Sequence, residues 1–253
     1  MKKLFVLVFG ISVLVPHAIG LEMTGDEIIQ KMNDLLNPET TYGKSKMTIV
    51  TTSGKKRTFV LESWSKGAGE KTLMRYLEPS RVKGLATLML NNADDIWMFF
   101  PRTQRIRKLA SHAKKQKMQG GDFSYEDMGG GDAFITDYSA KRLPDETMEE
   151  LDCFQVELSR KPDSDMTYSR LILWVVKENF VPIVIDYYDE KDPGLHLKRL
   201  IQSDIKMIDN LPAAMKSVMI NKIDNAQTEI ELLEAKFNIE LDDGMFTERG
   251  LKK

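Results

Sequence analysis

Alternating apolar and polar positions dominate the chain beyond residue 40 and predict β-strands. Lys44–Val50 alternates regularly, and the turn Ser53-Gly54 joins it to Arg57–Ser65, which is typical of a β-hairpin. Further predicted strands, bounded by turn residues, span residues 71–77, 85–90, 96–100, 105–109, 152–160, 168–176, 180–188, 195–207, 215–223 and 228–239. Their short connections require antiparallel neighbours, because parallel strands need long crossovers. The pattern therefore predicts a mainly β protein with a few helices, built on a strongly curved sheet or an incomplete antiparallel β-barrel.

Residues 24–38 carry the spacing of an amphipathic helix. Thr24 and Glu27 match a capping box, in which the two residues satisfy each other's free backbone N–H groups. The apolar residues of this segment share one face; they are Ile28, Ile29, Met32, Leu35 and Leu36. Pro38 ends the predicted helix. Since a single apolar stripe needs an apolar surface to cover, we expect Asp26–Leu36 to be a lid on the sheet. Further helical turns are expected near residues 123–128 and 245–250.

Several predicted strands are apolar on both faces. Residues 85–90, 96–100, 171–176 and 180–185 lack the alternation of a sheet that is wetted on one side. Either helices and loops cover both faces, or the sheet curls around an apolar cavity that a ligand fills. The residues expected to line such a cavity are Met47, Ile49, Phe59, Leu61, Met74, Tyr76, Met89, Trp97, Phe99, Ile172 and Trp174. A register error of one residue would exchange each of them for a neighbour on the opposite face.

The first twenty residues have the pattern of a secretory signal peptide. Lys2 and Lys3 precede the apolar run Leu4–Val15, and Ala18-Ile19-Gly20 offers small residues for cleavage. The run is short for a membrane span, although an uncleaved anchor is the alternative. We therefore expect residues 1–20 to be removed, and residues 21–253 to form a single soluble periplasmic domain.

Composition narrows the range of functions. Without residues 1–20 the chain holds 34 basic and 38 acidic residues, a net charge of −4, which argues against wholesale nucleic-acid binding. The single cysteine, Cys153, lies in an apolar strand and is expected to be a buried thiol; only His112 and His196 could partner it in catalysis. Metal-binding and hydrolase motifs are absent from the sequence. We expect no enzymatic activity, no cofactor and no metal.

The segment from residue 102 to residue 117 is strongly basic. It contains seven cations and no acidic residue: Arg102, Arg105, Arg107, Lys108, Lys114, Lys115 and Lys117. A basic segment on a net-negative chain can bind lipid head groups or an acidic partner. A solvated loop is the plain alternative. The glycine-rich sequence that follows is not a phosphate-binding loop, because it lacks the Gly-Lys-Ser/Thr ending.

The same region carries a family resemblance. The matching motifs are Pro79…Lys83-Gly84, Trp97–Pro101, Arg105–Arg107, Gly121–Asp127, Pro182…Tyr187-Tyr188-Asp189 and Asp243–Thr247. With these the chain resembles the outer-membrane lipoprotein-sorting-protein-like periplasmic proteins, relatives of the lipoprotein localisation carrier. The resemblance implies a half-barrel around a hydrophobic cavity, lidded by helices. It also implies carriage of lipid-like cargo between membranes, sometimes beside an exporter of the resistance-nodulation-division type, and it offers no catalytic residues.

Two functions of different classes follow from the sequence. The first is a periplasmic carrier that binds lipid or lipoprotein acyl chains, for which a dry cavity needs no precise hydrogen bonds. The second is a non-enzymatic accessory subunit of an exporter or envelope complex, which would use the basic segment as its docking surface and need no cavity ligand. Lipid that copurifies with the protein separates the two hypotheses.

Overall fold

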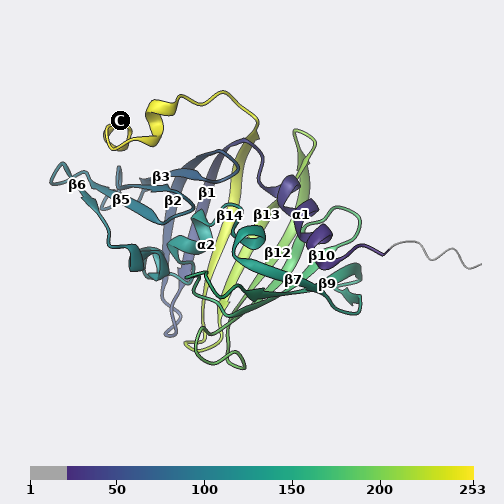
Figure 1. Ribbon diagram of the computed structural model, residues 1–253. Helices are drawn as coiled ribbons and strands as arrows, with labels where there is room; N and C mark the ends of the chain where they lie inside the picture. Colours follow the sequence, from purple (N-terminus) through teal and green to yellow (C-terminus); the bar gives the residue numbers. More distant parts are fainter. Residues whose placement is uncertain (1–21) are drawn as a thin grey trace, which may run out of the picture.

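The computed structural model describes residues 22–253, and one large antiparallel sheet organises them (Figure 1). Its first half consists of β1 (Thr40–Val50), β2 (Lys56–Lys66), β3 (Lys71–Glu78), β4 (Ala86–Leu90), β5 (Asp95–Phe100) and β6 (Arg105–Lys108). Its second half consists of β7 (Tyr138–Arg142), β8 (Glu146–Met148), β9 (Leu151–Arg160), β10 (Arg170–Val176), β11 (Pro182–Tyr188), β12 (His196–Ile208), β13 (Leu211–Asn221) and β14 (Ala226–Phe237). The predicted fold class is confirmed: the fourteen strands form an open, strongly curved sheet.

The strand order places the first and last strands side by side at the middle of the sheet. The order is β6-β5-β4-β3-β2-β1-β14-β13-β12-β11-β10-β9-β7, with β8 paired to β9. The last strand, β14, lies between β1 and β13, so β6 and β7 are the two edges. The connection from β6 to β7 must therefore cross from one edge to the other. It carries the short helices α2 (Tyr125–Gly129) and α3 (Ala133–Thr136) and the 3-10 turns η1 (Ser111–Lys115) and η2 (Met118–Gly120).

Helix α1 (Gly25–Leu36) lies in the hollow of the curved sheet (Figure 1). The predicted capping box is present: the Glu27 backbone N–H donates to Thr24 Oγ1 at 3.2 Å, and the Thr24 N–H donates to Glu27 Oε2 at 2.7 Å. Ile28, Ile29 and Met32 are buried in a cluster with inward side chains of β9 to β13. The helix thus covers the second half of the concave face, as a lid would.

A second apolar cluster fills the first half of the concave face. It combines inward side chains of β1 to β5 with Met118 and Tyr125 from the connection between the edge strands. Ile230 of β14 packs against both clusters, so the two lie on the same face of the sheet. Residues 109–137 therefore cover the first half of the hollow and, through Phe123 and Phe134, share the second half with α1.

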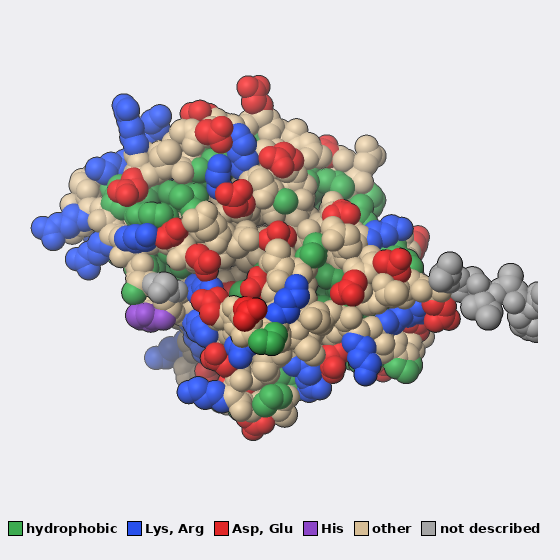
Figure 2. Space-filling view, viewed as in Figure 1, with side chains coloured by type: hydrophobic (Ala, Val, Ile, Leu, Met, Phe, Trp, Pro, Cys, Tyr) green, Lys and Arg blue, Asp and Glu red, His purple; other side chains and the backbone are tan. Residues whose placement is uncertain are grey.

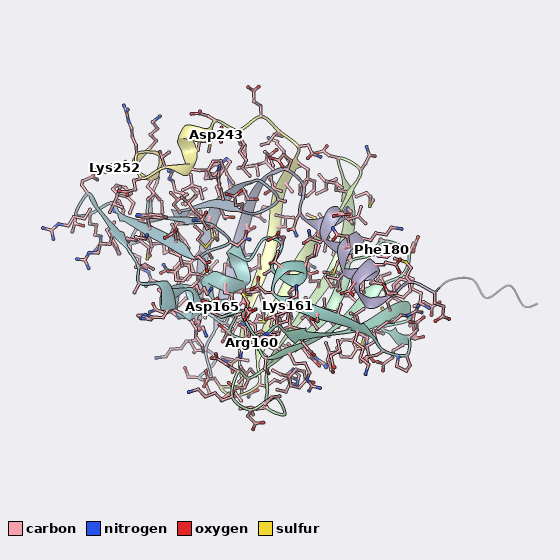
Figure 3. All side chains as sticks on the ribbon, in the orientation of Figure 1. Arg160, Lys161, Asp165, Phe180, Asp243 and Lys252 are labelled. Atoms are coloured by element: carbon pink, nitrogen blue, oxygen red, sulfur yellow. The ribbon has the colours of Figure 1, made fainter. Side chains whose placement is uncertain are left out.

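The convex face is also covered in two places, which explains much of the two-sided apolar pattern. The C-terminal segment, with 3-10 turns at Asp243–Phe246 and Gly250–Lys252, crosses the back of β3 to β5, where Phe246 and Leu251 are buried (Figure 3). The Arg75 guanidinium donates to the Gly250 carbonyl at 3.2 Å and fixes this segment. The back of β9 to β11 buries a separate apolar cluster.

No helix within residues 22–253 is long and apolar enough to cross a membrane. The predicted signal peptide, residues 1–20, and its cleavage site lie outside the described residues.

Candidate functional site

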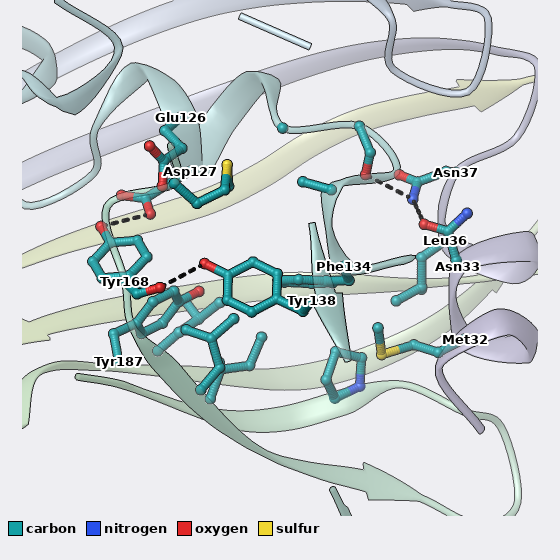
Figure 4. Close-up of a pocket in the computed structure, with 18 of the residues that line it drawn as sticks. Met32, Asn33, Leu36, Asn37, Glu126, Asp127, Phe134, Tyr138, Tyr168 and Tyr187 are labelled. Carbon is teal, nitrogen blue, oxygen red and sulfur yellow. Dashed lines mark hydrogen bonds between the residues drawn. The ribbon is translucent and has the colours of Figure 1, made fainter. Parts of the chain in front are cut away.

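A pocket of about 300 Å³ opens in the concave face between α1, the α2–α3 segment and strands β10 to β12 (Figure 4). Its apolar wall consists of Met32, Leu36, Met128, Ala133, Phe134, Met166, Leu171, Pro182, Ile185 and Leu200. Strands β10 to β12 supply Leu171, Pro182, Ile185 and Leu200, and α1 supplies Met32 and Leu36. The other four side chains come from the α2–α3 segment and the loop before β10. The volume is at the lower end of the range of about 300–1,000 Å³ found for ligand pockets. The pocket is therefore suited to an apolar ligand, and α1 limits its size.

Polar side chains also line the pocket. The Asn37 side-chain amide donates to Asn33 Oδ1 at 2.7 Å and to the Gly131 carbonyl at 3.3 Å, which links α1 to the α2–α3 segment (Figure 4). The Tyr138 hydroxyl donates to the Tyr168 carbonyl at 3.1 Å. These bonds hold the rim without crossing the apolar interior.

The motif Gly121–Asp127 forms a buried polar hub beside the pocket. The carboxylate of Asp127 accepts hydrogen bonds from Lys198 Nζ at 2.5 Å, from the Tyr168 hydroxyl at 3.0 Å and from the Ser124 N–H at 2.6 Å. Lys198 also donates to the Asp122 carbonyl at 3.3 Å. Because a buried charge needs both a partner and hydrogen bonds, this arrangement fixes the connection firmly onto β12. The motif that carries the family resemblance thus has a structural role.

Two further acids of the motif are satisfied by the sheet and its loops. Asp122 accepts a hydrogen bond from the Thr228 hydroxyl at 2.8 Å and one from the Asn221 amide at 3.2 Å. Glu126 accepts bonds from the Thr167 N–H at 3.0 Å and the Thr167 hydroxyl at 2.9 Å. Burial raises the pKa of Glu126, because desolvation outweighs these hydrogen bonds.

The eleven residues predicted to line a cavity separate into two groups. Seven of them lie together on the concave face, in the cluster that residues 109–137 cover; they are Met47, Ile49, Phe59, Leu61, Met74, Tyr76 and Met89. The pocket under α1 is lined by none of the eleven, and Met74 borders a smaller one of about 150 Å³. The seven residues therefore pack against the connection between the edge strands.

The other four predicted residues point to the convex side. Trp97 and Phe99 pack with the C-terminal segment. Ile172 and Trp174 belong to the cluster on the back of the second half, where the Trp174 indole N–H donates to Glu146 at 2.7 Å. In each strand the neighbouring positions face the hollow, so the inward residue Leu171 lines the pocket where Ile172 does not.

Within the described part of the chain, the seven predicted docking cations separate into four lysines that pair with acids and three arginines that do not. Lys114 is only 4% exposed, and it bonds to Asp94 at 2.7 Å and to Asp165 at 2.6 Å. The remaining ion pairs are Lys115 with Glu190 at 3.3 Å, Lys117 with Asp224 at 3.0 Å and with Asp122 at 3.7 Å, and Lys108 with Asp95 at 2.6 Å. Acids outside the basic segment thus neutralise these four lysines.

Arg102, Arg105 and Arg107 remain exposed, and no acid of residues 22–253 lies within 4.0 Å of them. The loop between β3 and β4 adds exposed Arg81 and Lys83 at the same end of the sheet. An ideal Cβ on Gly84 would lie 3.4 Å from the Pro101 side chain, so the two loops are neighbours. We call these five residues the cationic end (Figure 2).

Sequence reasoning missed Lys198 and the two cations of the β3–β4 loop. Lys198 occupies an inward position of β12, between His196 and Leu200. A lone cation at an inward position of an alternating strand indicates a buried ion pair. Arg81 and Lys83 join the cationic end only through the pairing of neighbouring strands, which sequence alone did not reveal.

Comparisons with known proteins support the fold. A family model described as an uncharacterized protein matches residues 68–253. A DUF1329 family protein from Desulfovibrio piger is 24% identical, with a TM-score of 0.82 over 90% of this chain and 97% of its own. A structure from Vibrio parahaemolyticus, described as an outer membrane lipoprotein-sorting protein domain, is 24% identical, with a TM-score of 0.82 over 90% of this chain and 98% of its own.

A LolA superfamily protein from Nitrosomonas europaea is 21% identical, with a TM-score of 0.74 over 90% of this chain and 99% of its own. No protein with curated function matches the chain. The predicted resemblance to the lipoprotein-sorting-protein-like fold is confirmed by these structures.

Proposed function

We propose that this chain, which belongs to the family whose model matches residues 68–253, is a periplasmic carrier of lipid or lipoprotein acyl chains. The observation that carries this proposal is an apolar pocket in the hollow of a half-barrel, closed by an amphipathic helix. The half-barrel fold shared with a lipoprotein-sorting protein domain and a LolA superfamily protein supports it. Trafficking toward the outer membrane is the role we assign, with no catalytic step.

The energetics of the pocket fit an acyl chain. Each CH₂ group removed from water contributes about 0.8 kcal/mol, so a sixteen-carbon chain gains roughly 12 kcal/mol before ordering costs. A pocket of about 300 Å³ is small for such a ligand. We therefore infer that cargo displaces α1, whose buried face competes for the same apolar surface. The same competition would release cargo when the helix closes.

Blocking the pocket is expected to abolish uptake. Gln202 of β12 lines the pocket, whereas its neighbour Ser203 is exposed on the other face. Gln202→Trp places a large side chain in the pocket and is expected to lower the affinity for a fluorescent acyl probe at least about tenfold, since most of the buried ligand surface is lost. Ser203→Trp is the matched control and should bind like the unmodified protein. Equal affinity of both variants contradicts the pocket assignment.

The cationic end is our proposed contact with the membrane during transfer. Its arginines and lysine flank Val82 and Phe100, which pack at the margin of the concave apolar cluster. Each cation near an anionic membrane contributes about 1 kcal/mol. Five cations give enough attraction for transient attachment, and screening by salt keeps that attachment reversible. Docking through this end would bring the hollow of the sheet close to the lipid head groups.

Charge removal at the cationic end is expected to abolish this attachment. The variant carries Arg81→Gln, Lys83→Gln, Arg102→Gln and Arg105→Gln. Its co-sedimentation with phosphatidylglycerol vesicles at low salt should fall at least about tenfold. The matched control removes the same charge from exposed lysines elsewhere, through Lys141→Gln, Lys191→Gln, Lys216→Gln and Lys222→Gln.

If the cationic-end variant and the lysine control lose vesicle binding to the same extent, net charge alone drives binding. Failure of the unmodified protein to bind the vesicles would point to the alternative partner, an acidic surface of an inner-membrane exporter.

A further inference from the structure

The pocket under α1 contains acidic lining residues and no basic one. Of its twenty lining residues, Glu126 and Asp127 are the only charged members. Lys198 neutralises Asp127 from behind the wall, at 2.5 Å. No lysine or arginine of residues 22–253 lies within 4.0 Å of the Glu126 carboxylate, whose hydrogen bonds come from Thr167. The pocket thus already holds one carboxylate without a cationic partner.

A second anion in this pocket would be costly. It would lose its hydration in a largely apolar site and would meet the carboxylate of Glu126. The raised pKa of Glu126 reflects the same low-dielectric surroundings. Ionised carboxylates and phosphates are therefore disfavoured as ligand head groups here.

Hydrogen-bonding groups without charge are nevertheless available. Tyr187 is 6% exposed, its side chain lies in the pocket wall, and its hydroxyl has no hydrogen-bond partner within residues 22–253 (Figure 4). The side-chain amide of Gln202, which also lines the pocket, is likewise without a partner in the described part of the chain. A hydroxyl in the pocket wall that has no protein partner can bond to a ligand or to water. These two groups can donate to an ester carbonyl and accept from a hydroxyl.

We propose that the pocket selects acyl lipids whose head group is uncharged and forms hydrogen bonds, such as an acylglycerol, over lipids with an anionic head group. The Tyr187 hydroxyl donates to the ester carbonyl, Gln202 bonds to a glycerol hydroxyl, and the apolar wall holds the first part of the acyl chain. This inference rests on the proposed function, and it adds the ligand class to it.

Two ligands with the same acyl chain test the selection. In separate experiments, monooleoylglycerol and oleate compete with the fluorescent acyl probe for the pocket. The pH is about 8, where a free carboxylate is ionised. We expect monooleoylglycerol to bind at least about tenfold more tightly. Equal binding, or tighter binding of oleate, overturns the selection alone. If neither the two ligands nor the probe binds, the proposed function is overturned together with the selection.

Three variants assign the effect to named groups. Tyr187→Phe removes only the hydroxyl. It should weaken the affinity for monooleoylglycerol about fivefold and leave the affinity for oleate unchanged. Tyr188→Phe, which changes the neighbouring residue outside the pocket lining, is the matched control. Glu126→Gln keeps the shape of the side chain and should strengthen oleate binding. If the affinities for both ligands are unchanged in Tyr187→Phe and in Glu126→Gln, and both variants keep the circular dichroism spectrum of the unmodified protein, the assignment is overturned.

Discussion

Replacing Lys198 with methionine is expected to lower the free energy of unfolding by about 3–5 kcal/mol, because it leaves the buried carboxylate of Asp127 without its cation. The same ammonium bonds to the Asp122 carbonyl and lies over the rings of Tyr168 and Tyr187, at 4.8 and 5.1 Å from their centroids. Its removal should therefore release the connection between the edge strands from the sheet. Urea unfolding measures the change.

A matched variant isolates the buried interaction. Lys216→Met removes an exposed cation from the neighbouring strand β13 and should change the free energy of unfolding by less than about 0.5 kcal/mol. Combining Lys198→Met with Asp127→Asn should restore part of the lost stability, since no unpaired charge then remains. A Lys198→Met protein as stable as the Lys216→Met control contradicts the role of the hub.

Adding a side chain at Gly25 is expected to detach the start of α1 from the sheet. An ideal Cβ on Gly25 would lie 2.8 Å from the backbone N of Arg142 and 2.9 Å from the backbone carbonyl carbons of Ala140 and Lys141. Since these are backbone atoms of β7, the helix must move. Gly25→Val should cost up to about 3 kcal/mol and raise hydrogen exchange in α1 about a hundredfold.

The lid hypothesis adds a functional consequence to this substitution. Uptake of the acyl probe should become faster in Gly25→Val, because the closed state of α1 is weakened. Gln30→Val places the same side chain on the exposed face of the helix and serves as the control. Unchanged exchange and uptake in Gly25→Val would mean that α1 does not act as a lid.

The sheet and its lid helix could be predicted because their signals are local. Turn sequences set the antiparallel connections, and the capping box of Thr24 and Glu27 sets the start of α1. The inward residues of β1 to β3 also follow from regular alternation, as Met47, Ile49 and Phe59 illustrate. Local pattern was sufficient wherever one face of a strand is less apolar than the other.

Where both faces are buried, local pattern cannot choose between them. The outward position of Phe99 depends on the cluster that it forms with the C-terminal segment, which lies far away in the sequence and contributes Phe246 and Leu251. Trp174 is outward because the loop and hairpin around Glu146 cover the back of the second half. Such contacts between distant segments decide which side chains of a strand face outward. An error of one residue in this assignment places every side chain of the strand on the opposite face.

Charge pairing is hidden in the sequence for the same reason. Residues 102–117 contain no acid, yet the fold brings Asp94 and Asp165 to Lys114 and Glu190 to Lys115. The basic segment therefore has two parts. Its lysines form ion pairs that hold the connection between the edge strands in place, and its arginines stay exposed. The pocket under α1 likewise needs side chains from three separate parts of the chain, which no single motif reveals.

The most direct test of the carrier function is mass spectrometry of organic extracts from protein purified gently from periplasmic extract. The apolar pocket and its helical lid predict acyl lipid in an amount close to one molecule per protein chain, and its loss from the Gln202→Trp variant. Unmodified, folded protein that carries no lipid and takes up none from vesicles would contradict the proposed carrier function.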